Sequence, residues 1–142
     1  MSAKENKRIV ERFIDRVVTG RDVQSVDACC GEDVVMRVPN GVAYGRSGVR
    51  KLLSDWFSAV PDGRFSQEYC IAEGEFVACR TMLRGTFAGN YRGVSANGRK
   101  VALPQLWMFR LAEDLIREIE VTYDMGLLHA QLGTLLPSVI EK

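Results

Sequence analysis

One carboxylate stands where an apolar strand pattern gives way to an apolar helix pattern. Asp124 lies within the stretch V-T-Y-D-M-G-L-L-H, which begins at Val121. Asp at such a junction can cap the following helix, because its side chain accepts hydrogen bonds from the first free backbone N–H groups. It can instead face a cavity, where burial raises its pKa and lets it act as a general acid or base. Both interpretations stay open, and Asp124 is the candidate catalytic residue.

A second candidate group lies on the stretch L-P-Q-L-W-M-F-R, which begins at Leu103. Alternation along a strand places Gln105, Trp107 and Phe109 on one face. If that face borders a pocket, Gln105 could hydrogen-bond a ligand carbonyl or an enolate, and Trp107 could stack on a planar ring. The alternative is an edge-strand glutamine and a core tryptophan.

Four more aromatic residues complete the candidate substrate-binding set. Phe13, Trp56 and Phe57 fall on expected helices, where they either contact a ligand or belong to the core. Tyr44, in the turn V-A-Y-G-R, either reaches the mouth of a pocket or lies on the surface. Glu120 alternates onto the face of Asp124, and there it either pairs with that carboxylate or is solvated.

The signatures of several catalytic classes are absent from the sequence, including G-x-S-x-G, G-x-G-x-x-G after a strand, the phosphate-binding loop and H-E-x-x-H. The single histidine, His129, leaves a His/Cys zinc site short of ligands, so we expect no metal and no cofactor. The cysteines Cys29, Cys30, Cys70 and Cys79 form no C-x-x-C pair. Without a visible secretory signal, we expect them to be reduced, small buried hydrophobic residues in a cytoplasmic protein.

The composition is that of a globular protein and favours neither a nucleic acid nor a membrane as partner; the partner that we expect is a small-molecule substrate. The 142 residues carry a net charge of +1, with 46% hydrophobic and 26% charged residues, and we expect one domain over 1–142. Scattered Lys and Arg give no basic patch for nucleic acid. The longest uncharged stretch, Met125–Ile140, falls short of the ~20 apolar residues of a membrane span.

Hydrophobic periodicity predicts the elements that position these residues. Four-residue spacing predicts helices over 9–18, 47–60 and 127–136, with a short helix over 22–30. Two-residue spacing predicts strands over 33–39, 65–72, 76–87, 100–111 and 115–124. The last four strands form an antiparallel meander apart from the helices, which indicates an α+β fold. A curved sheet wrapped over three helices leaves a conical space between them.

The chain resembles the SnoaL-like polyketide cyclases, also called ester cyclases, of the nuclear transport factor 2-like superfamily. The resemblance rests on an ordered set of stretches that spans nearly the whole sequence. These are V-E-R-F-I-D-R-V-V-T-G-R-D, G-E-D-V-V-M-R-V-P, Y-G-R-S-G-V-R-K-L-L-S-D-W-F-S-A-V-P-D-G-R-F, L-R-G-T-F-A-G-N-Y-R-G-V-S-A-N-G-R-K-V and W-M-F-R-L-A-E-D-L-I-R-E-I-E-V-T-Y-D-M-G-L-L-H-A-Q-L-G.

The resemblance implies a conical α+β barrel: a curved antiparallel sheet around three N-terminal helices, with a short C-terminal helix. It also implies a homodimer or higher homo-oligomer packed through the sheet. The family's acid/base aspartate on the last strand corresponds to Asp124. Many relatives carry histidine where Trp107 stands and E-H-W where this chain has Glu118-Ile119-Glu120, so Gln105 is the candidate replacement partner.

Three functions follow as hypotheses. The first is a cofactor-independent cyclase of an aromatic polyketide, with Asp124 moving the proton in an intramolecular aldol-type ring closure. The second is a polyketide hydroxylase or an epoxide-opening enzyme on the same fold. The third is a non-catalytic small-molecule binding module.

Overall fold

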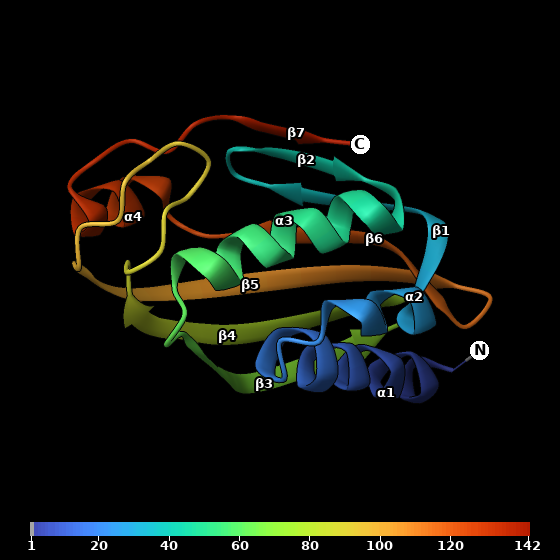
Figure 1. Cartoon of the computed structure of the whole chain (residues 1–142). Helices are drawn as coiled ribbons and strands as arrows, with labels where there is room; N and C mark the ends of the chain where they lie inside the picture. The colour runs from blue at the N-terminus through green and yellow to red at the C-terminus, as the bar shows by residue number, and fades with distance from the viewer. Residues whose placement is uncertain (1) are drawn as a thin grey trace.

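The computed structural model describes residues 2–142 and has the expected α+β architecture, a curved sheet with helices on its concave side (Figure 1). The helical segments are α1 Ala3–Phe13, the π-helical continuation η1 Ile14–Thr19, the 3-10 turn η2 Val23–Ser25, α2 Val26–Cys29, α3 Gly45–Ala59 and α4 Met125–Leu132. The strands are β1 Cys30–Val38, β2 Gly41–Tyr44, β3 Arg64–Glu73, β4 Phe76–Thr86, β5 Lys100–Ala112, β6 Leu115–Thr122 and β7 Val139–Glu141.

The predicted meander forms one half of the sheet. The strand order is β3-β4-β5-β6-β1-β2-β7, and β3 to β6 pair antiparallel in chain order. The sheet then continues through β1, which lies parallel to β6. The short strands β2 and β7 were not predicted, because three or four residues are too few to show a period.

Several helix ends differ from the prediction, among them the start of α1, which lies at Ala3 rather than Ile9. α3 begins at Gly45, two residues before the expected start at Ser47, with Tyr44 in the capping position. α4 ends at Leu132, well before the expected Leu136, because Gly133 adopts a left-handed conformation with a φ of 70°. A left-handed glycine just after the last helical residue is a frequent helix stop. The chain from Gly133 onward is therefore free to fold back toward β2, where β7 pairs.

The core lies between the concave face of the sheet and the helices α1 and α3. Phe13, Leu52, Leu53 and Phe109 are all buried in it, and the Phe13 and Phe109 rings meet edge to face with centroids 5.6 Å apart. Burying a large apolar side chain contributes about 1.5–3 kcal/mol, so this contact fixes α1 over one end of β5. The pocket described below lies at the other end.

Two of the cysteines are paired, which corrects the prediction that all four are reduced. Cys70 on β3 and Cys79 on β4 lie opposite one another in the ladder and form a disulfide, with their Cα atoms 4.1 Å apart. The spacing of the cysteines could not reveal this pair, because the register of two strands is set only in the folded sheet. Cys29 and Cys30 are free and buried, as expected, and burial raises the pKa of the Cys30 thiol to about 12.

Within residues 2–142, none of the helices combines the length and the apolar character that crossing a membrane requires.

Candidate functional site

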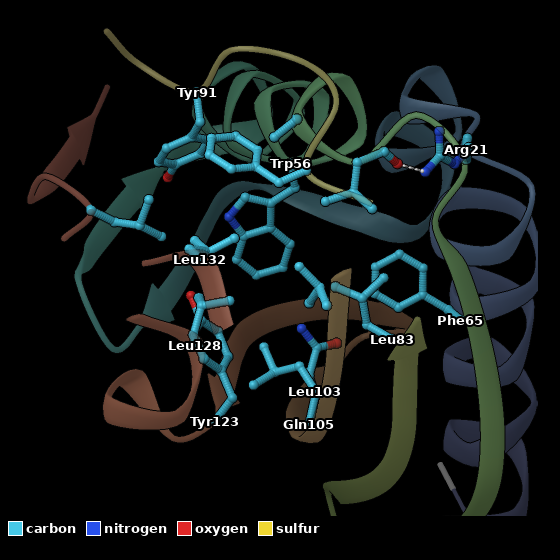
Figure 2. A pocket seen from close by; sticks show the side chains of 15 residues that line it. Arg21, Trp56, Phe65, Leu83, Tyr91, Leu103, Gln105, Tyr123, Leu128 and Leu132 are labelled. Carbon is cyan, nitrogen blue, oxygen red and sulfur yellow. Dashed lines mark hydrogen bonds between the residues drawn. The ribbon is translucent and has the colours of Figure 1, made fainter. Parts of the chain in front are cut away.

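An apolar cavity of about 70 Å³ lies between α3, the first half of β5 and α4 (Figure 2). Most of its wall is aliphatic or phenylalanine side chain. The polar groups on the wall belong to five residues: Arg21, Trp56, Tyr91, Gln105 and Tyr123. Among the described residues that line the cavity there is no carboxylate. A concave apolar space with a few polar groups is the usual form of a small-molecule site.

Gln105 is the predicted residue that the structure places most clearly in the cavity. It is 3% exposed and lies on the inward face of β5. Its Oε1 accepts hydrogen bonds from Thr81 Oγ1 at 3.3 Å and Trp107 Nε1 at 3.4 Å. These contacts identify the amide oxygen and leave Nε2 as the free end, since within residues 2–142 no acceptor lies in hydrogen-bond geometry with it. Figure 2 shows the amide reaching into the cavity toward Trp56. An amide N–H group that opens onto a cavity is suited to a ligand carbonyl oxygen.

Trp107 does not line the cavity but lies behind Gln105. It is fully buried, and its Nε1 also donates to Thr81 Oγ1 at 3.1 Å. Its ring stacks on Phe109 with centroids 6.0 Å apart. The expectation that Trp107 stacks on a ligand therefore does not match its position, because the rings of its own core occupy its face. Its place is that of a support that orients the Gln105 amide.

Trp56, on α3, does line the cavity, as predicted. Its ring meets those of Trp107 and Tyr123 edge to face, with centroid separations of 6.3 and 6.1 Å. Edge-to-face aromatic pairs are stabilising and hold ring orientations firmly. Trp56 is therefore held as a fixed wall opposite Gln105 (Figure 2).

Three other predicted binding residues lie away from the cavity. Phe13 belongs to the core under α1. Phe57 packs edge to face against Phe65, with centroids 6.3 Å apart, and under the Arg21 guanidinium. Tyr44 is 45% exposed on β2 and does not reach the mouth of the cavity. Both phenylalanines face inward as expected, but neighbouring helices and strands cover them.

Asp124 is not at the cavity wall where the prediction placed it. Strand β6 ends at Thr122, and Asp124 is the N-cap of α4, with its Oδ1 accepting from Leu127 N at 3.0 Å. The side chain is exposed, and Glu120 is exposed as well, so the two carboxylates form no buried pair. Of the two roles open to Asp124, the structure shows the cap.

The capping role gives a measurable expectation. Asp124→Ala removes the acceptor for Leu127 N and should lower the free energy of unfolding by about 1 kcal/mol, whereas Asp124→Asn keeps a capping oxygen and should change it little. Urea denaturation of the two variants beside the wild type measures the difference. Equal losses in both would show that the negative charge, rather than the cap, carries the effect.

Two tyrosines in the cavity wall were not predicted from the sequence. Tyr123 continues the inward alternation of Ile119 and Val121, and that period could have identified it. Tyr91 lies in the glycine-rich loop between β4 and β5, where no period exists to reveal it. Burial raises the pKa of both hydroxyl groups, so both remain protonated and able to donate near neutral pH.

Arg21 lines one side of the cavity, but its guanidinium is occupied by hydrogen bonds within the protein. Its guanidinium donates to the carbonyl oxygens of Val60 and Pro61, at 2.5 and 2.9 Å, just past the end of α3. It also lies 5.2 Å from the centroid of the Phe57 ring. Cations near a helix C-terminus stabilise the free carbonyl groups there, so Arg21 has a structural role.

In the part of the chain that the structure describes, no three His, Cys, Asp or Glu side chains gather in a way that could hold a metal ion.

Solved structures share this fold. A protein from Jannaschia sp. CCS1, described as a SnoaL-like polyketide cyclase, is 19% identical with a TM-score of 0.85, and the match covers 92% of each chain. TsrD from Streptomyces laurentii is 25% identical with a TM-score of 0.79, over 95% of this chain and 99% of TsrD. IdmH from Streptomyces antibioticus, described as a polyketide cyclase, is 23% identical with a TM-score of 0.75, over 90% of this chain and 98% of IdmH.

No curated protein matches the chain in sequence. The model of the SnoaL-like polyketide cyclases matches residues 8–132, which include the meander, α3 and α4. This match covers most of the chain, and the fold agrees with it. The chain therefore belongs to the SnoaL-like polyketide cyclase family.

Proposed function

We propose that this protein is a cofactor-independent cyclase that closes a carbon ring in a polyketide-like substrate. The observation that carries the proposal is the buried Gln105 amide, whose Nε2 points without a partner into an apolar cavity. Membership of the family supports the class of reaction. The proposal assigns the chemistry to neutral hydrogen-bond donors and leaves Asp124 as a helix cap.

The ring closure that we propose needs no base from the protein. A 1,3-diketone exists partly as its enol, whose central carbon attacks a ketone farther along the same molecule. A carbon–carbon bond forms, negative charge develops on the attacked ketone oxygen, and the enol proton moves to that oxygen, so the product is an isomer of the substrate. Gln105 Nε2 donates to the oxygen where charge develops, and such a preorganised donor stabilises the transition state.

The apolar wall supplies the second contribution. It folds the flexible substrate so that the two reacting carbons lie within reach. The entropy of ordering the substrate is therefore lost on binding rather than in the transition state. Trp56, Leu103 and Leu128 contribute to this wall from three different elements. A substrate with ketones along an apolar backbone suits such a wall better than a charged one.

The cavity must widen to admit such a substrate. Its volume of about 70 Å³ is well below the ~150 Å³ of an apolar cavity that binds benzene. The segment from α4 to β7 has little regular structure and contributes Leu136 to the wall, where Leu136 N donates to His129 Nε2 at 3.1 Å. We propose that this segment moves outward when the substrate enters.

The experiment uses nonane-2,4,8-trione, a 1,3-diketone whose central methylene closes a six-membered ring on the remote ketone. Wild-type protein should accelerate this ring closure by about 10²-fold or more over buffer, because orientation and one donor both contribute. Proton NMR follows the loss of the remote methyl ketone signal. A rate equal to that in buffer, at trione concentrations that saturate binding, rejects the cyclase.

A non-catalytic binding module is the second candidate. The absence of a carboxylate among the described residues that line the cavity favours it. The same experiment separates the two, because a binding module holds the trione without changing its rate of ring closure. A hydroxylase or epoxide-opening enzyme that uses an acidic pair has less support, since Glu120 and Asp124 are both exposed.

We also propose that the protein forms a homodimer through the convex face of the sheet. Neighbouring strands expose apolar side chains there, namely Ile71 on β3, Phe76 on β4, and Leu106 and Met108 on β5. Exposed apolar patches on a sheet commonly mark interfaces between proteins. Sedimentation velocity measures the mass in solution, and a monomer at micromolar concentration rejects this arrangement.

A further inference from the structure

We propose that Tyr91, Trp56 and Tyr123 form a second polar subsite in the cavity, which binds a ketone oxygen of the ligand. The three polar groups belong to a loop, a helix and the end of a strand, and they gather at one end of the apolar wall (Figure 2). The subsite rests on the proposed function, because it names the second oxygen that the same substrate must carry. It is distinct from the Gln105 amide, which reaches the cavity from β5.

The first observation is a buried hydroxyl without a partner. Tyr91 is 4% exposed, and its Oη has no hydrogen-bond partner within residues 2–142. The neighbouring Asn40 Oδ1 is also buried without a hydrogen bond in the described chain, although Asn40 Nδ2 donates to Pro137 O at 2.9 Å. Buried polar groups almost always have partners, and leaving one unpaired costs about 1–3 kcal/mol. A buried hydroxyl without a partner on the wall of a cavity indicates a site for an acceptor from outside the chain.

The second observation is that two further donors lie beside this hydroxyl. The Trp56 side chain adjoins Tyr91 Oη, and the Trp56 and Tyr123 rings meet with centroids 6.1 Å apart. Trp56 lies within hydrogen-bond reach of Tyr91 Oη, and an indole that donates to this oxygen leaves the Tyr91 proton available for a ligand. An indole N–H can only donate, and a phenol hydroxyl can donate. The subsite therefore offers donors to an acceptor oxygen.

The charges behind the subsite are already paired. Arg92 Nη2 lies 2.8 Å from Asp55 Oδ2 and 2.8 Å from Glu141 Oε2, and Lys51 Nζ lies 2.8 Å from Asp55 Oδ1. Two cations thus face two carboxylates, and no net charge remains to hold an anion. Burying an unpaired carboxylate is costly, so a neutral acceptor fits better. A ketone oxygen is such an acceptor, and it has no proton that would compete with the tyrosine donors.

The protonation of the tyrosines agrees with this role. Burial raises the pKa of Tyr91, while Asn40, Arg92 and Trp56 lower it by smaller amounts. Burial also raises the pKa of Tyr123, and the nearby Tyr91 adds to that rise. Both hydroxyl groups therefore keep their protons throughout the pH range in which a cell works.

The test uses a pair of ligands of the same shape, cyclohexanone and methylenecyclohexane, which differ only in oxygen against methylene. Binding of each is measured by titration in ¹H–¹⁵N correlation spectra, in which the indole N–H of Trp56 gives its own signal. Tyr91→Phe should weaken cyclohexanone binding by about fivefold and leave methylenecyclohexane binding unchanged, because only the ketone uses the hydroxyl. Tyr44→Phe, which removes an exposed hydroxyl outside the cavity, is the matched control and should change neither.

A structural role for the Tyr91 hydroxyl gives a different result. Without ligand, Tyr91→Phe should melt at the same temperature as the wild type or higher, since it removes an unpaired buried hydroxyl. Equal effects of Tyr91→Phe on both ligands, or a clearly lower melting temperature, would overturn the subsite. Binding of neither ligand by the wild type would overturn the subsite, whereas the rate of trione ring closure decides the proposed function. Binding of both with no Trp56 signal shift from the ketone would overturn the subsite alone.

Discussion

Gln105→Met should slow the ring closure of nonane-2,4,8-trione by about 10²-fold, with substrate binding weakened far less. Methionine has nearly the length of glutamine but carries no N–H, so the change removes the one amide donor that the cavity receives from β5. The donor matters most when negative charge develops on the attacked oxygen, and for this reason the effect falls on the rate constant rather than on binding. Proton NMR gives the rate at saturating trione.

The matched control for Gln105→Met is Leu103→Met. Leu103 lies two residues before Gln105 on the same face of β5 and lines the same cavity. Its exchange alters the shape of the wall by a similar amount but removes no polar group. The control should retain the rate within a few-fold. Equal losses in both variants would show that Gln105 contributes shape alone.

Trp107→Ala should lower the free energy of unfolding by about 3–5 kcal/mol, the range for truncating a large aromatic residue in a core. Trp107 is fully buried, stacks on Phe109, meets Trp56 edge to face and donates from Nε1 to Thr81. Removal of the ring leaves a cavity and frees the Thr81 and Gln105 oxygens from a donor. A loss of this size is a large part of the stability of an ordinary domain.

Chemical denaturation measures the effect of Trp107→Ala, and Trp107→Phe separates its two parts. Phenylalanine keeps a ring to stack on Phe109 but has no Nε1 to hold the Gln105 amide oxygen. This variant should lose less stability and still close the trione ring more slowly, because the Gln105 amide is less firmly oriented. A stability loss below about 1 kcal/mol in Trp107→Ala contradicts the core position.

The sequence allowed most of the fold to be predicted, since the meander strands and the longer helices each repeat their apolar pattern over eight residues or more. Strands β2 and β7 lack such a repeat. β2 forms by pairing with the edge of β1, and β7 forms by pairing with the edge of β2. The Cys70–Cys79 pair likewise depends on register. Pairing between distant segments is a property of the assembled sheet, and local periods do not contain it.

The candidate site was predictable only in part, and β5 shows why. Alternation placed Gln105, Trp107 and Phe109 on the inward face, and all three are inward. Alternation does not say which inward residues border an empty space. Phe13 of α1 covers Phe109 at one end of the strand, and the cavity is left at the end that carries Gln105. An inward position therefore predicts burial, whereas a place at the cavity depends on where the helices end.

Asp124 and Tyr123 show how a shift of one position along the chain changes the role of a side chain. Inward positions on β6 recur at Ile119 and Val121, and Tyr123 follows in the same period into the cavity wall. Asp124 is one residue farther, where the chain turns into α4, and its carboxylate meets the free amide of Leu127. Asp124 was predicted to be catalytic from its chemical type, whereas the two-residue period of β6 points to Tyr123 as the inward residue.

The most direct test of the account is the rate at which Asp124→Asn closes the ring of nonane-2,4,8-trione. Asparagine keeps the capping oxygen and removes the only function that a general acid or base could use. If neutral donors in the cavity catalyse the reaction, the rate of ring closure by this variant stays within about twofold of the wild-type rate. A loss of about 10²-fold with unchanged melting would return the proton transfer to Asp124 and contradict the mechanism proposed here.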